Sequence, residues 1–158
     1  MPPPVDMTLP TAVKRPGVSY LAAVLLAIIG LLFAVIAVVD LVEPVSWTGT
    51  EEALITGAVY KGVMFLVAVV AAIMVVVGLD FGRVLGAGVA GAAMWLASNA
   101  WVSVLAILMN GGFNTLPFEF FLLFLPPILA GFFGVAALLV LAAPSFSQWS
   151  VDRRKARS

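Results

Sequence analysis

Polar side chains inside otherwise apolar stretches are the positions at which this sequence could perform chemistry. The candidates are Lys61, Ser98, Asn99, Ser103 and Glu119. An ionisable group in an apolar segment is costly and is usually kept for a function, so Lys61 and Glu119 could form a proton or anion relay. Asn99 and the two serines could line a polar cavity or a substrate pathway.

The same residues also have structural interpretations. Lys61 can extend toward an aqueous interface or pair with an acid. The acids considered as partners are Glu43, Glu51, Glu52 and Glu119. Hydrocarbon offers no partner for the Asn99 amide, so we expect Asn99 to avoid lipid and to form a hydrogen bond between helices that fixes their register. The sequence leaves the pathway and the structural hydrogen bond both open.

The residue types that are missing restrict the chemistry further. The sequence contains no cysteine and no histidine, which removes disulfides, thiolate nucleophiles, Cys or His metal sites and haem ligation through either residue. A serine nucleophile would need a lysine as its base, and Lys61 has no serine near it in the sequence. We also find no phosphate-binding glycine loop. The expectation is a protein without catalytic activity, cofactor or metal.

Long apolar segments must position the candidate residues. Of the 158 residues, 63% are hydrophobic and 10% are charged, against roughly 25% charged residues in a soluble domain. Four segments reach the roughly 20 apolar residues that a membrane span needs. They cover approximately residues 18–39, 55–79, 84–109 and 117–143. The predicted fold is an all-α membrane protein with a bundle of four transmembrane helices.

The first span, 18–39, could also be a secretory signal peptide. It is longer than the apolar region of such a peptide and lacks a small-residue cleavage site, so we interpret it as a retained helix. The predicted organisation is a flexible Pro-rich tail over 1–17, a transmembrane domain over 18–143 and an interfacial, basic tail over 144–158.

The distribution of lysine and arginine predicts the orientation, because cytoplasmic flanks accumulate them. With both termini in the cytoplasm, Lys61 is the one cation on the far side. The cations then on the cytoplasmic side are Lys14, Arg15, Arg83, Arg153, Arg154, Lys155 and Arg157. The abundance of Ala, Val and Gly is typical of a high-GC bacterial genome, so we expect a multi-pass protein of the bacterial inner membrane.

The third span carries two stripes of residues that favour close helix contacts. Small residues along one face let a neighbouring backbone approach. They are Gly82, Gly86, Ala90, Ala93 and Ala97; Gly88 and Gly91 are further packing candidates. A second stripe, roughly opposite, contains Gly88, Ala92, Trp95, Asn99, Ser103 and Asn110. Two such faces predict that this helix is the central one of the bundle.

Two local features accompany this pattern. Before the third span, Asp80 and Arg83 could pair across a tight turn. In the fourth span, Pro126 and Pro127 remove backbone donors and favour a kink or break. Such a break can expose carbonyls at a transport site, although prolines are also common in passive membrane helices.

These observations favour a small non-catalytic accessory or scaffold subunit, packed against a larger membrane transport or envelope complex. The alternative is a homo-oligomeric channel or small transporter, whose pathway would use Asn99, Ser103, Lys61 and Glu119. A holin-like pore former is a third possibility that no motif supports. The expected partners are the lipid bilayer and either a larger membrane protein or further copies of the chain. Nucleic acid is not expected, because a few cations at one terminus make no extended basic surface.

Overall fold

The computed structural model describes residues 17–42, 51–109, 118–144, 148 and 151, except for the side chains of 51–54 and 118–122. The helices are α1 (Gly17–Val42), α2 (Glu51–Val77), α3 (Asp80–Met109) and α4 (Phe118–Ala142). Within these ranges, all four helices contain a stretch that is long and apolar enough to cross a membrane. The prediction of an all-helical chain with four such helices is confirmed.

Several predictions concern parts of the chain outside the described residues. They include the Pro-rich tail before residue 17, Pro117 as the first residue of the fourth helix, and Asn110 in the second stripe. The basic residues of the C-terminal tail also lie outside the described residues, as does the side chain of Glu119.

The first connection is shorter than the sequence predicted. Helix α1 continues through Asp40 to Val42, and α2 begins at Glu51, so Asp40 belongs to a helix and not to the loop. The physical reason is that the Asp40 carboxylate has a partner on the neighbouring helix, in Lys61. Because Lys61 compensates the charge of Asp40, the helix can continue past this acid.

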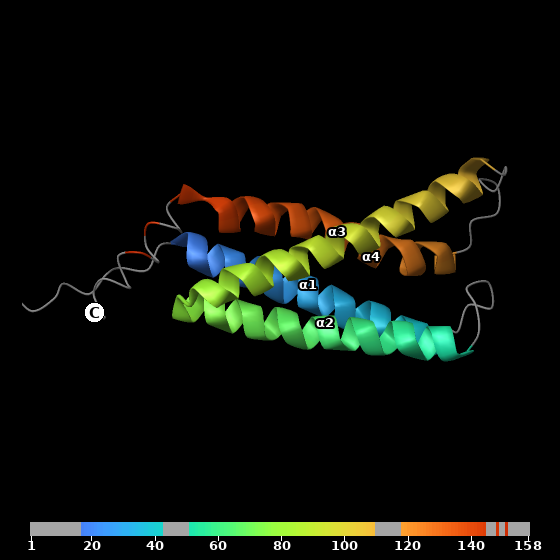
Figure 1. Cartoon of the computed structure of the whole chain (residues 1–158). Coiled ribbons are helices and arrows are strands. Elements are labelled where there is room, and N and C mark those ends of the chain that lie inside the picture. The colour runs from blue at the N-terminus through green and yellow to red at the C-terminus, as the bar shows by residue number, and fades with distance from the viewer. Residues whose placement is uncertain (1–16, 43–50, 110–117, 145–147, 149–150, 152–158) are drawn as a thin grey trace, which may run out of the picture.

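Helix α1 lies between α2 and α4, while α3 crosses the bundle obliquely and packs mainly on α4 and the nearer part of α2 (Figure 1). Direct contact between α1 and α3 is slight. In its most apolar stretch α1 has 44% of its residues buried, against 22% for α3. The central helix is therefore α1, and the prediction that α3 is central was wrong because most of its second stripe is exposed in the described chain.

The core combines large side chains from α1 with small ones from its neighbours. Leu26, Ile29 and Phe33 are fully buried. They belong to a cluster that includes Ala68, Ala71, Ala90, Ala93, Ala130 and Ala137 of the other helices. Alanine lets the backbones approach closely. In an apolar solvent such as lipid, this contact is the main source of helix association, because apolar burial drives little.

Gly78 permits the abrupt turn between α2 and α3. Its φ of 80° is in the left-handed region that side chains disfavour. The Gly78 N–H donates to the Val75 carbonyl at 3.1 Å, and the Leu79 N–H donates to the Met74 carbonyl at 2.9 Å. This pair of bonds is a Schellman cap. Gly82 follows, where an added Cβ would lie 2.7–2.8 Å from Met74 and from the Val75 nitrogen. The two helices therefore pass very close to each other at this turn.

Candidate functional site

Lys61 forms an ion pair with Asp40, which joins the last turn of α1 to α2. The two side chains are 15% and 14% exposed. Gly57 lies next to the pair, and an added Cβ there would be in ordinary van der Waals contact with Asp40 Oδ2, at 3.8 Å. The sequence prediction named four other acids and missed Asp40, because residue spacing does not give the alignment of α1 against α2 that brings Asp40 beside Lys61. A relay between Lys61 and Glu119 stays a prediction, since the Glu119 side chain is not described.

This ion pair has a clear structural role. A charge with little contact with water is tolerated when an opposite charge lies beside it, and removal of either partner leaves the other uncompensated. The pair thus ties the last turn of α1 to α2, and this end of α1 lies opposite to the α2–α3 turn (Figure 1).

Asn99 and Ser103 lie on an exposed part of α3 and bond to their own helix. Asn99 Nδ2 donates to the Trp95 carbonyl, and Ser103 Oγ donates to the Asn99 carbonyl, each at 3.1 Å. These are bonds to the residue four positions earlier. A side-chain amide has two N–H donors and one oxygen acceptor, and the described helices provide only the partner at Trp95. The predicted hydrogen bond from Asn99 to a second helix is not formed within the described chain.

The two stripes of α3 have different surroundings. The inner face, formed by Gly82, Gly86, Ala90, Ala93 and Ala97, is buried. Of the outer stripe, Gly88, Trp95, Asn99 and Ser103 are exposed and form the outer face. Ala92, predicted in the same stripe, is half-buried and packs against the core. Trp95 is 62% exposed, and an added Cβ at Gly88 or at the nearby Gly91 would meet open space. Packing by Gly88 and Gly91 therefore stays a prediction, and it requires a helix beyond those described.

The interior of the described bundle is apolar. Among the side chains that the structure describes, Ser19 is the one buried polar group, and it has an interaction partner. Ser98 is exposed and lines a surface hollow. The described helices therefore enclose no row of polar groups that could form a pathway through a single copy.

Helix α4 continues through Pro126 and Pro127 without a break. Pro127 is buried and Pro126 is half-buried, so both prolines belong to the packed bundle. A kink at these positions stays a prediction. A broken helix that presents carbonyls to a transported molecule is not seen in the described part of α4.

Sequence reasoning missed the glycines that bring α4 against α3. An added Cβ at Gly131 would collide with Cβ of Ala97, and one at Gly134 would lie 2.8 Å from the Ala90 carbonyl oxygen. The signal was present as two glycines three residues apart in an apolar helix, a spacing that places both on one face.

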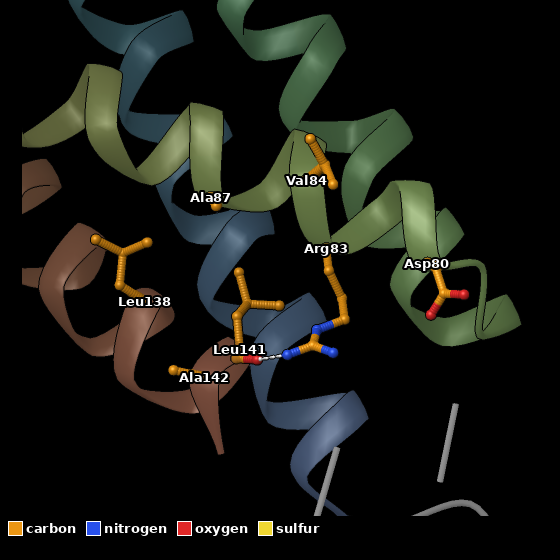
Figure 2. A pocket seen from close by; sticks show the side chains of 7 residues that line it. All are labelled: Asp80, Arg83, Val84, Ala87, Leu138, Leu141 and Ala142. Atoms are coloured by element: carbon orange, nitrogen blue, oxygen red, sulfur yellow. Dashed lines mark hydrogen bonds between the residues drawn. The ribbon is translucent and has the colours of Figure 1, made fainter. Parts of the chain in front are cut away.

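Arg83 marks a surface hollow at the end of the α3–α4 contact (Figure 2). Its guanidinium Nη2 donates to the Leu141 carbonyl at 2.8 Å, in the last turn of α4. The hollow is about 590 Å³ and is lined by Asp80, Arg83, Val84, Ala87, Leu138, Leu141 and Ala142. Asp80 and Arg83 thus share one hollow, and a direct pair between them stays a prediction.

The residues described above define an all-helical protein whose four helices are long and apolar enough to span a membrane. In the described ranges, no group of three or more His, Cys, Asp or Glu side chains could hold a metal ion. Compared with known protein families, curated proteins and solved structures, the chain matches none.

Proposed function

We propose that this chain is a non-catalytic membrane subunit that attaches to a larger membrane protein, of a transport or envelope complex, through the outer face of α3. In this proposal the chain crosses a bacterial inner membrane four times, with both termini in the cytoplasm. The observation that carries the proposal is that Gly88, Asn99 and Ser103 are exposed on α3. Hydrocarbon offers no partner for the donor and acceptor that the Asn99 amide has beyond its bond to Trp95.

The positions of the charged groups support the membrane location. The described ion pair Asp40–Lys61 lies at one end of the bundle, and Asp80 and Arg83 lie at the other. Along α2, the 16 steps from Lys61 to Val77 rise about 24 Å at 1.5 Å per residue. This length fits within a hydrocarbon layer of about 30 Å.

The outer face offers what a second membrane helix needs. Gly88 leaves open space next to the backbone, and small residues let another helix approach. Asn99 can donate one more hydrogen bond and accept through its oxygen, which would give the partner helix a fixed register. An assembly role also agrees with the apolar interior of the described bundle.

A homo-oligomeric channel or small transporter is the second candidate, and a specific observation favours it. Ser98, Asn99 and Ser103 are all exposed on α3, so a ring of copies could place them around a shared pathway. In that arrangement the pathway lies between copies and not inside one.

Purification of the tagged chain in mild detergent at native expression, followed by native mass spectrometry, tests the two candidates. A stoichiometric larger partner supports the subunit proposal, and a homo-oligomer alone overturns it. Asn99→Leu should weaken the assembly by roughly three- to thirtyfold, the range expected for polar contacts between membrane helices. The same variant should not change the free energy of unfolding, because the Asn99 side chain bonds to its own helix.

Val70→Leu is the matched control, since Val70 is exposed on α2 away from the outer face. Assembly of the Asn99→Leu variant at wild-type strength would contradict the proposed interface. Loss of flux with an intact homo-oligomer would instead support the pathway.

A further inference from the structure

We propose that the α3–α4 seam binds one membrane phospholipid that has an amine in its headgroup, with the phosphate at Arg83, the amine at Asp80 and an acyl chain along the seam. This inference rests on the proposed membrane location but not on the proposed assembly through the outer face. The seam is the surface between α3 and α4 that runs from the Arg83 hollow to a second hollow at Ser98.

The second hollow lies on the same side of the seam as the first. It is about 350 Å³ and is lined by Met94, Ala97, Ser98, Trp101, Ile128, Gly131, Phe132 and Val135. Each α3 residue that lines the second hollow lies 14 positions after an α3 residue that lines the first. Fourteen residues make almost four whole turns of helix, so the two sets face the same direction.

The distance between the hollows suits an acyl chain. From Arg83 to Met94, α3 rises about 16 Å at 1.5 Å per residue, which is close to half of the roughly 30 Å hydrocarbon layer. The groups along this path are apolar, and Gly91 lies between the hollows with open space where a side chain would be. A chain anchored at Arg83 therefore reaches the second hollow, where Trp101 and Phe132 are 46% and 66% exposed.

Arg83 is suited to the phosphate. The guanidinium carries five N–H donors in a planar fork that matches phosphate oxygens. One of these N–H groups donates to the Leu141 carbonyl, which holds the side chain at the opening of the hollow (Figure 2). A phosphate at this position would accept from other N–H groups of the same guanidinium.

Asp80 decides which headgroup is favoured. Asp80 lines the same hollow, where its negative charge would repel a headgroup with only negative charge. A headgroup with a phosphate and a primary amine is instead complementary to the acid and the base together, because the ammonium can donate to the carboxylate. Phosphatidylethanolamine has this chemistry. Phosphatidylglycerol lacks the amine, and phosphatidylcholine lacks the N–H donors.

Native mass spectrometry of the delipidated full chain in detergent, with each of these three lipids added at equal acyl-chain length, tests the proposal. Phosphatidylethanolamine should bind most tightly. Arg83→Gln should weaken binding of all three by about tenfold, the size expected for a charge-assisted hydrogen bond. Asp80→Asn should remove the preference for phosphatidylethanolamine over phosphatidylcholine. It should not weaken the binding of phosphatidylglycerol.

A second variant avoids the Arg83–Leu141 contact. Ala87→Leu fills the first hollow and should weaken the binding of all three lipids. Ala27→Leu, on the exposed surface of α1, is the control and should bind them like the wild type. If Arg83→Gln and Ala87→Leu both bind the lipids as tightly as the wild type does, the proposed site is wrong. Equal affinity of the wild type for the three lipids overturns the headgroup assignment.

Inorganic phosphate separates the headgroup from the whole lipid. Phosphate at millimolar concentration should not displace phosphatidylethanolamine, because the acyl chain contributes to binding. Displacement would show a simple anion site and overturn the role of the seam. The assembly measured for Asn99→Leu is independent of these outcomes, so a failure of either proposal can be recognised separately.

Discussion

The inner and outer faces of α3 both contain glycine but have opposite surroundings. Gly82 and Gly86 are buried against α2, α1 and α4, while Gly88, six residues after Gly82, is exposed and has open space around it. Side-chain size alone therefore does not determine which face packs within a chain. The difference lies in what the neighbours present, because an added Cβ at Gly82 meets backbone atoms of α2 that cannot move aside.

The largest expected effect contrasts the two faces directly. Gly82→Leu should lower the free energy of unfolding by about 3 kcal/mol or more, because overpacking against a rigid backbone cannot be relieved by side-chain rotation. Gly88→Leu is the matched control and should leave stability unchanged or slightly higher, since leucine favours helix more than glycine does. Thermal unfolding in detergent followed by circular dichroism measures both. Equal destabilisation by the two variants would contradict the assigned faces.

An intermediate effect is expected when the outer face is blocked. Gly88→Leu should weaken the proposed assembly by about tenfold, since a bulky side chain keeps another helix away from the backbone. Chemical crosslinking in native membranes, with the same change at Ala27 as the control, measures the yield of assembled protein. A wild-type yield for Gly88→Leu would show that no helix packs at this position.

The smallest effect is expected at Ser103. Ser103→Ala removes only a hydrogen bond to the Asn99 carbonyl of the same helix. The free energy of unfolding should therefore change by no more than about 0.5 kcal/mol. Assembly should weaken by at most about threefold, close to the average for polar contacts between membrane helices. Analytical ultracentrifugation in detergent can resolve this difference. If Ser103→Ala weakens assembly more than Asn99→Leu does, Ser103 and not Asn99 is the main contact.

Part of this architecture could be predicted from sequence. The apolar segments are long enough to identify the helices by length alone. A periodicity near 3.6 identified the buried inner face of α3 and most of its exposed outer face, with Ala92 assigned to the wrong one. Periodicity assigns residues to sides of a helix but does not identify what each side meets. For this reason the outer stripe was expected to contact neighbours within the chain.

Other features depend on how the helices align in space. Helix α1 is apolar on all sides, so its pattern does not distinguish a central helix from a peripheral one. The pairing of Lys61 with Asp40 requires the relative height of α1 and α2, which residue spacing does not provide. The Arg83 hollow joins residues of α3 to the last turn of α4, more than 50 positions later, and sequence reasoning considered only Asp80 as a neighbour of Arg83.

The turn at Gly78 has a consequence for how the bundle can move. With a left-handed glycine, two capping hydrogen bonds and a backbone contact at Gly82, α2 and α3 are held together at this end. Relative motion of these two helices is then restricted to a scissor-like opening about the turn, widest at the ends farthest from it. A spectroscopic label pair at Val59 and Trp101 would report this opening, whereas a pair at Ile73 and Val84 would stay at a constant separation.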